Sequence, residues 1–142
     1  MLKQTNSVAS AYRAKNMSIK EKAEQYALTK HNQKTIYISG QITGLPYEDA
    51  LSAFDKAEKY LKSIGYAVIN PMTHVPYNEN WSWFDYMGED IKLLGKCDSI
   101  YMLKGWLNSD GARIEHSIAT KKNINIIYEK WTIHRLMLSC KK

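Results

Sequence analysis

The sequence predicts an α/β protein whose parallel β-sheet of four to five strands is covered by helices on both faces. Short runs of β-branched and aromatic residues, typical of buried strands, occur at 35–39, 66–70, 98–103 and 124–128. Between these runs, apolar residues recur at the spacing of amphipathic helices. Strands that alternate with helices form right-handed βαβ units, and such units build a parallel sheet.

The helix after the first strand has the clearest boundaries. Its apolar stripe, at helical spacing, consists of Ala50, Phe54, Ala57, Leu61 and Ile64. Glu48 and Asp49 are typical of an acidic first turn, and Gly65 is typical of a helix end.

The second strand closes at Pro71 and is followed by a loop with an aromatic cluster, Tyr77, Trp81 and Trp83. A second helix is predicted from the stripe Phe84, Met87, Ile91 and Leu94. A third spans 114–120 after the third strand, and a last apolar stripe lies in the tail, at 131–138.

The first 34 residues differ from the rest in composition. They contain no Gly or Pro, and they hold seven Lys or Arg against two acids. Ser18 and Glu21 have the spacing of a capping box, which predicts a helix over 19–30. We therefore expect a basic helical extension at 1–34 and an α/β domain at 35–142.

The charge distribution argues against a core that binds nucleic acid. Residues 35–129 hold nine basic against twelve acidic side chains, so the net charge of +6 belongs to the two ends of the chain. A nucleic-acid-binding core would show the opposite distribution. A basic arm that contacts nucleic acid is the alternative to a solvated helix face.

Several other classes are disfavoured by composition. No apolar run approaches the roughly 20 residues that span a bilayer, and no secretory signal is visible. Cys97 and Cys140 form no disulfide framework, and no Cys/His cluster has metal-ligand spacing, so we expect no metal or cofactor and a cytoplasmic location. The glycine fingerprints of dinucleotide and P-loop sites are missing.

The segment 109–116 is the strongest candidate for a functional site. It follows the third predicted strand and opens a helix, at the edge where α/β sheets bind ligands. Free N–H groups at a helix N-terminus suit a phosphate or a carboxylate. Glu115, in the predicted first turn, is a candidate for chemistry; the alternative is an exposed acid paired with Lys121 or Lys122.

The loop after the first strand is a second candidate. It consists of Ser39, Gly40, Gln41, Ile42, Thr43 and Gly44. Its small residues let backbone N–H groups approach a ligand, and its hydroxyl and amide side chains can hydrogen-bond to one. The alternative is an ordinary turn in which glycine supplies a positive φ.

Asp90 borders the predicted apolar face of its helix, whereas Glu89 points outward. A carboxyl beside an apolar face can have a raised pKa and then act as a proton donor. The alternative is a solvated or capping carboxylate. Asp98 is expected to be a structural turn residue with a local backbone hydrogen bond, and His116 is also expected to be structural.

Four segments in order carry a resemblance to a known family: 36–44, 65–71, 90–94 with 97–98, and 111–116. Together they resemble the nucleoside 2-deoxyribosyltransferase superfamily, in particular its small phage and bacterial members, over residues 35–129. The superfamily also contains deoxynucleoside 5′-monophosphate N-glycosidases. The resemblance implies a flavodoxin-like, Rossmann-like sheet, cleavage of an N-glycosidic bond, and a homo-oligomer that completes its sites across subunits.

The resemblance also implies roles for individual residues. Glu115 takes the place of the nucleophile that attacks the anomeric carbon, and Asp90 that of the acid that handles the departing base. Ser109 takes the place of a phosphate-binding serine, and the loop from Ser39 to Gly44 lines the sugar and phosphate site. Aromatic side chains, Tyr37, Trp81 and Trp83, are candidates for stacking on the base.

The sequence departs from the family patterns at several positions. Thr43 stands where the monophosphate hydrolases have arginine, and Asp110 with Gly111 only partly matches the acid and glycines of the transferases. Arg113 is absent from both patterns and is a candidate to bind phosphate. Hydrolysis and transfer, and nucleoside and nucleotide substrates, therefore stay open. Binding of a nucleotide, or of a nucleotide-derived signal, without turnover is the alternative function.

Overall fold

The computed structural model describes residues 18–24 and 33–129. The chain divides into two units, Met1–Gln33 and Lys34–Lys142, and each is described by itself. In the first unit, the described residues 19–24 are helical, and Ser18 and Glu21 form the predicted capping box through backbone N–H bonds of 2.8 and 3.2 Å. The remainder of the predicted helix and the tail stripe lie outside the described residues.

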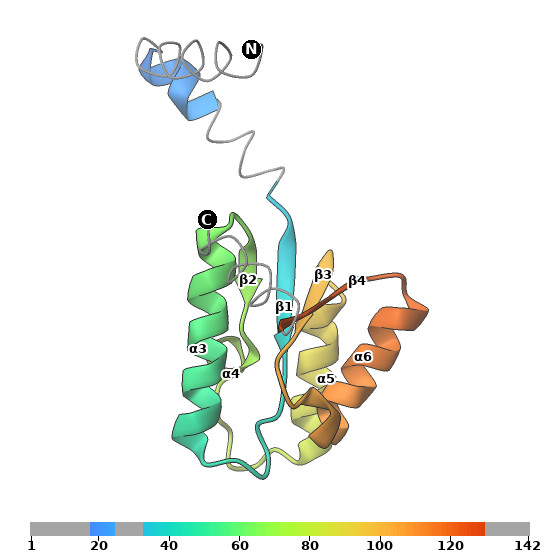
Figure 1. Cartoon of the computed structure of the whole chain (residues 1–142). Coiled ribbons are helices and arrows are strands. Elements are labelled where there is room, and N and C mark those ends of the chain that lie inside the picture. The colour runs from blue at the N-terminus through green and yellow to red at the C-terminus, as the bar shows by residue number, and fades with distance from the viewer. Residues whose placement is uncertain (1–17, 25–32, 130–142) are drawn as a thin grey trace, which may run out of the picture. The chain divides into compact units, whose positions relative to one another are not determined.

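The second unit is built on a four-stranded parallel sheet with the order β2-β1-β3-β4 (Figure 1). The strands are β1 (Thr35–Ser39), β2 (Ala67–Ile69), β3 (Ser99–Met102) and β4 (Asn125–Tyr128). Because the chain leaves β1 for β2 on one side and returns to β3 on the other, β1 and β3 flank the switch point where open α/β sheets bind ligands. The predicted fold class is confirmed.

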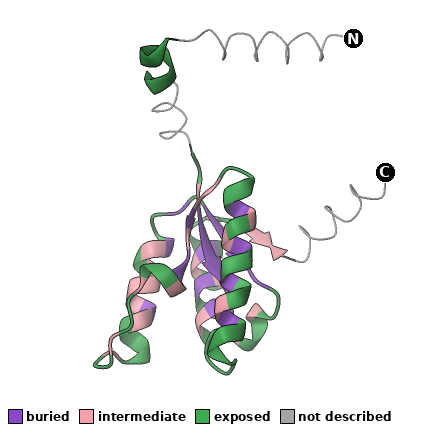
Figure 2. Ribbon diagram, turned by 90° about the vertical axis from the view of Figure 1, so that its left-hand side faces the viewer, coloured by how far each residue is buried: buried purple, intermediate pink, exposed green. Residues whose placement is uncertain are grey.

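Helices cover both faces of this sheet, and the central strands β1 and β3 are buried between them, whereas the edge strand β4 is only partly buried (Figure 2). The helices are α3 (Tyr47–Ser63), α4 (Pro71–His74), α5 (Trp83–Leu94) and α6 (Asp110–Lys121), with a short 3-10 turn η1 (Trp106–Asn108). Successive side chains of β1 point to opposite faces of the sheet, and each face has its own hydrophobic core. Ile36 and Ile38 pack with Phe54 of α3. Tyr37 packs with Leu94 of α5 and Ala119 of α6.

The structure corrects four details of the predicted elements. Pro71 starts helix α4 instead of a loop, and α6 begins at Asp110, four residues before the predicted start, because Ser109 caps it. Phe84 and Ile64, placed in apolar stripes, have 78% and 53% of their surface exposed. Phe84 lies at the start of its stripe, and Ile64 lies at the end of its stripe, where it caps α3.

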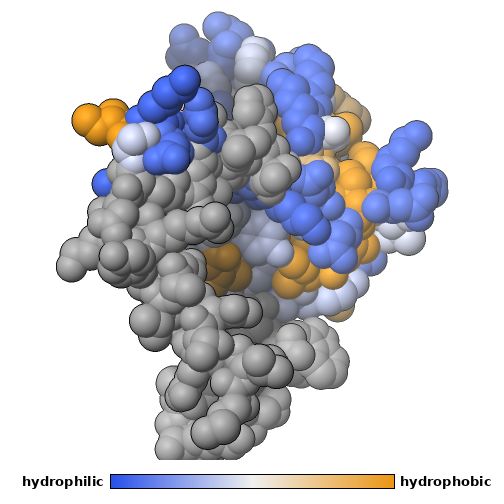
Figure 3. Space-filling model, turned by 90° about the horizontal axis from the view of Figure 1, so that it is seen from above, coloured by the Kyte–Doolittle hydropathy of each residue, from blue (hydrophilic) through white to orange (hydrophobic). Residues whose placement is uncertain are grey.

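The described surface is mixed in polarity. In the view from above, hydrophilic residues separate the apolar ones on the part of this face that is described (Figure 3). Within the described ranges, no helix is both long enough and apolar enough to cross a membrane.

Candidate active site

A pocket of about 560 Å³ lies beyond the carboxyl end of β1. Its walls come from four stretches of chain: the loop after β1 with the start of α3, α4 with the loop after it, one face of α5, and η1 with the first turns of α6. Asp90, Ser109 and Glu115 all line it. The structure therefore brings the two predicted carboxyls and the predicted helix N-terminus into one cavity.

Glu115 lies in the second turn of α6, at the inner end of the pocket. Only 5% of its surface is exposed; Oε1 accepts a 3.4 Å hydrogen bond from the Ser39 hydroxyl, and Oε2 has no hydrogen-bond partner among the described residues. Burial raises the pKa of this carboxyl to about 8, and the negative charge of Asp90 adds to the rise. The alternative that Glu115 is an exposed acid paired with a lysine is thus excluded. Its predicted place in the first turn of the helix is also wrong.

Asp90 faces the same cavity from α5. It is partly buried, and its side chain makes no hydrogen bond or ion pair with another described residue. Burial raises its pKa to about 6, with a contribution from Glu89, which points outward and pairs with Lys92. The capping role belongs instead to Asp85, which forms a capping box with Ser82. Asp90 is therefore available to a ligand.

Tyr37 lies in the core beneath Glu115 and does not stack in the pocket. Its ring is fully buried and its hydroxyl has no hydrogen-bond partner of ordinary geometry among the described residues. Burial, followed by the charge of Glu115, raises the pKa of this phenol well above its usual value, and the phenol in turn lowers that of Glu115. Tyr37 stays protonated, so its hydroxyl can donate a hydrogen bond to an ionised Glu115.

The other aromatic candidates divide into two groups. Trp83 lines the pocket, and so does Tyr77, which the sequence places in the same aromatic cluster. Trp81 is not among the lining residues and packs edge-on against Tyr86, with ring centroids 5.2 Å apart. Of the three predicted stacking candidates, Trp83 is therefore the one that lines the pocket.

The start of α6 forms one side of the pocket. Ser109, Asp110 and Gly111 line it, and the Ser109 hydroxyl accepts a 3.2 Å hydrogen bond from Ala112 N–H. Asp110 pairs with Arg113, which lies outside the pocket lining, so the arginine that the sequence offered as a phosphate ligand neutralises a neighbouring acid instead.

The loop after β1 contributes three residues to the lining, Gly40, Ile42 and Thr43. Gln41 turns away to hydrogen-bond the Thr43 carbonyl at 3.2 Å. Gly44 has the positive φ of 88° that the turn alternative requires, but Gly40 does not: a Cβ there would lie 2.8 Å from Leu103 Cδ1. Gly40 is therefore fixed by close packing beside the site.

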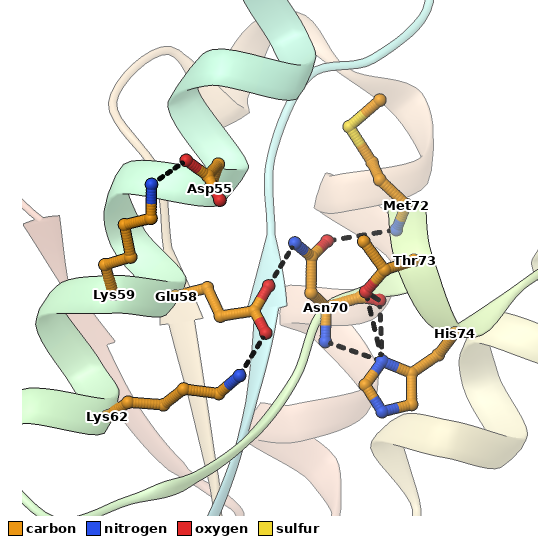
Figure 4. A network of polar contacts seen from close by, with 8 residues as sticks. All are labelled: Asp55, Glu58, Lys59, Lys62, Asn70, Met72, Thr73 and His74. Carbon is orange, nitrogen blue, oxygen red and sulfur yellow. Dashed lines mark hydrogen bonds and ion pairs between the residues drawn. The ribbon is translucent and has the colours of Figure 1, made fainter.

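Sequence reasoning missed the wall formed by α4, shown with its polar contacts in Figure 4. Asn70 is buried; its Oδ1 accepts from Met72 N–H at 3.0 Å and its Nδ2 donates to Glu58 at 2.8 Å. Glu58 also pairs with Lys62. Because Pro71 and Met72 line the pocket, this network fixes one wall to α3. The sequence does carry a signal for α4: Asn70 is a typical N-cap residue, and Pro71 follows it at the first helical position.

Two predicted structural residues lie away from the pocket lining. Asp98 accepts hydrogen bonds from Thr35 N–H and its hydroxyl at 2.8 and 3.1 Å, so it joins β3 to β1 and does not close a local turn. His116 stacks on Trp106 and lies 2.7 Å from the Tyr128 hydroxyl. Within the described residues, no group of three or more His, Cys, Asp or Glu side chains is placed to hold a metal ion.

The fold is one that 2-deoxyribosyltransferases share. The enzyme from Bacillus psychrosaccharolyticus is 19% identical, with a TM-score of 0.54 over 66% of this chain and 70% of that one. The enzyme from Leishmania mexicana is 17% identical, with a TM-score of 0.52 over 67% of this chain and 63% of that one. At these identities the similarity shows the fold, and it supports the resemblance seen in the sequence.

The family of the chain follows from its sequence. Residues 34–128 match the family model described as a domain of unknown function, DUF4406, and the chain belongs to this family. A search of curated proteins finds no match.

The Asn70–Glu58 contact gives a first prediction. In N70D, two carboxylates face each other at the 2.8 Å contact, although the Met72 cap can still form, and we expect a loss of about 1–3 kcal/mol in the free energy of unfolding. In the double variant E58Q/N70D the amide and carboxylate exchange places, and stability is expected to recover. Chemical denaturation measures both.

The control for this rescue is Asp55→Asn, which removes an exposed charge paired with Lys59 on the same helix. It is expected to change stability by less than about 1 kcal/mol. A double variant no more stable than N70D would show that the contact does not hold the wall.

The buried Glu115 gives a second prediction, on stability against pH. Its folded pKa of about 8 lies above the ordinary value of 4.5, so between these limits the folded state binds more protons than the unfolded one. Stability therefore falls as pH rises, by at most about 1.4 kcal/mol per pH unit. Because glutamine does not titrate, the stability of E115Q relative to the original chain is expected to increase from pH 5 to pH 8.

Denaturation curves at pH 5, 6.5 and 8 measure this difference. Glu89→Gln is the matched control, because that side chain is exposed and paired with Lys92. A difference between E115Q and the original chain that stays constant with pH would contradict a buried, neutral Glu115.

Proposed function

We propose that this protein cleaves the N-glycosidic bond of a nucleoside or nucleoside 5′-monophosphate, with Glu115 as nucleophile and Asp90 as the acid on the base side. One observation carries the proposal: a buried carboxyl and a partly buried one line the same pocket at the switch point of the sheet. The fold shared with 2-deoxyribosyltransferases supports it.

The chemistry of the bond explains why two carboxyls are needed. Cleavage passes through an oxocarbenium-like state, which a carboxylate near C1′ stabilises and then traps as an ester. The departing base needs a proton, which a second carboxyl supplies. Water or a second base then resolves the ester, and the acceptor decides between hydrolysis and transfer.

The surroundings of Glu115 suit a nucleophile that is held neutral until a ligand arrives. Its hydrogen bond from Ser39 and its nearness to the Tyr37 phenol both favour the carboxylate form, whereas burial and Asp90 oppose it. With pKa values of about 6 and 8, the pair holds about one proton near neutral pH. In the arrangement that can react, this proton is on Asp90 and Glu115 is ionised. Activity is therefore expected to fall below pH 6, where both carboxyls are protonated, and above pH 8, where neither is.

The third prediction concerns activity. Glu115→Ala is expected to abolish base release, because no other carboxylate replaces the nucleophile, and Asp90→Asn is expected to lower kcat by about 10²–10⁴ for a neutral base. Glu89→Gln, one residue along α5, is the control and is expected to keep the activity. HPLC of a panel of nucleosides and nucleotides measures the released base.

Equal release by Glu115→Ala, or no release from any member of the panel, would contradict the proposed function. Tight binding of a nucleotide that survives Glu115→Gln without any product would instead support the binding protein that the sequence left as the alternative. A homo-oligomer and a cytoplasmic location stay predictions of the sequence.

A further inference from the structure

The charge of the pocket lining is one-sided. Its acidic side chains are Asp90, Asp110 and Glu115, and none of the described residues that line it is Lys, Arg or His. Arg113 pairs with Asp110 and lies outside the lining. Among these residues, an anionic ligand would meet carboxylates and no cationic side chain. Complementarity therefore favours a ligand that carries positive charge at this site.

Two of the three acids have unused capacity to bind such a ligand. Glu115 lines the pocket and is 5% exposed, and its Oε2 has no hydrogen-bond partner of ordinary geometry among the described residues. The carboxyl of Asp90 likewise makes no hydrogen bond or ion pair with another described residue. Burial makes the ionised form of these carboxyls costly, and a positive charge brought by the ligand would offset that cost.

Aromatic rings form another part of the lining. Tyr77 and Trp83 are 88% and 43% exposed, and Trp83 packs edge-on against Phe84 with ring centroids 5.2 Å apart. Tyr47 and Tyr86 also line the pocket. The faces of aromatic rings attract cations and stack on flat heterocycles. A flat ring with a positive charge would satisfy the rings and the carboxylates together.

We infer that the substrate is a nucleoside whose base carries a fixed positive charge, namely an N-alkylated purine or a pyridinium, bound between the aromatic rings and Asp90. This inference rests on the proposed function for the reaction, and on the acidic pocket lining for the positive charge of the base. Such a base is an activated leaving group, since departure neutralises it.

The reaction balances without a proton donor. A carboxylate oxygen of Glu115 bonds to C1′ while the C1′–N bond breaks, and the bonding electron pair moves to the ring nitrogen, so the base leaves uncharged. Water then attacks C1′, the ester bond to Glu115 breaks, and the proton lost from water passes through a carboxylate to solvent. Asp90 serves as the counter-ion of the base in this substrate class.

The fourth prediction is tested first by binding, with probes that cannot react. NMR titration of the full chain, which detects millimolar affinities, compares 1-methylnicotinamide with neutral nicotinamide. We expect the cation to bind at least about tenfold more tightly. Asp90→Asn is expected to remove this preference, and Glu89→Gln, whose side chain pairs with Lys92 outside the lining, is expected to retain it.

Turnover is tested with two pairs of nucleosides, and each pair compares a positively charged base with its neutral counterpart. One pair has a purine base and the other a nicotinamide base, so the two classes of charged base are tested separately. One pair is 7-methyl-2′-deoxyguanosine and 2′-deoxyguanosine; the other is nicotinamide riboside and its 1,4-dihydro form. The charged member is expected to have the larger kcat/KM, corrected for release without protein. In Asp90→Asn, the loss is expected in KM for the charged member and in kcat, by about 10²–10⁴, for the neutral one.

The outcomes separate this inference from the proposed function. Equal binding of the two nicotinamides, or binding of neither, overturns the inference, and cleavage of neutral nucleosides alone would then leave the proposed function standing. Preferential binding of the cation with no cleavage of any nucleoside supports the cation site and contradicts the proposed function. Preference for the cation in both binding and turnover, lost in Asp90→Asn and kept in Glu89→Gln, supports both.

Discussion

The burial of the Glu115 carboxyl is the constraint on which the site depends. A carboxyl that is 5% exposed, with one oxygen bonded at 3.4 Å and the other without a partner of ordinary geometry among the described residues, costs stability that an apolar side chain would not cost. This unfavourable burial occurs at the carboxyl edge of the sheet, which is where open α/β sheets bind ligands. Such a strained acid, beside a second carboxyl in the same pocket, is typical of functional sites.

The topology explains how distant residues meet there. The strand order β2-β1-β3-β4 puts the carboxyl end of β1 at the switch point, with Ser39 as its last residue. Helices α5 and α6 cover the same face of the sheet, so Asp90 and Glu115 reach the cavity from two sides. Asn70 anchors the remaining wall to α3 through Glu58. The walls of the pocket thus belong to one packed unit.

Much of this arrangement could be predicted from the sequence, because strand runs and helix stripes are local patterns. The bounds of β1 agree with the predicted strand to the residue, and Glu115 and Asp90, the two candidate carboxyls, line the same pocket. The start of α6 was missed because Asp110 and Gly111 are typical of a loop, although Ser109 is a good N-cap. The roles of Tyr37 and Arg113 were missed because they depend on contacts between neighbouring layers and turns that spacing alone does not reveal.

Direct trapping of the glycosyl ester tests the central claim, that Glu115 attacks C1′ in this pocket. A nucleoside with fluorine at C2′ slows breakdown of the ester by destabilising the oxocarbenium-like state, and mass spectrometry of the digested protein then locates the adduct. We expect the added glycosyl mass on the peptide that contains Glu115, and none in Glu115→Gln. Base release without any adduct on that peptide, or an adduct at another residue, would contradict the claim.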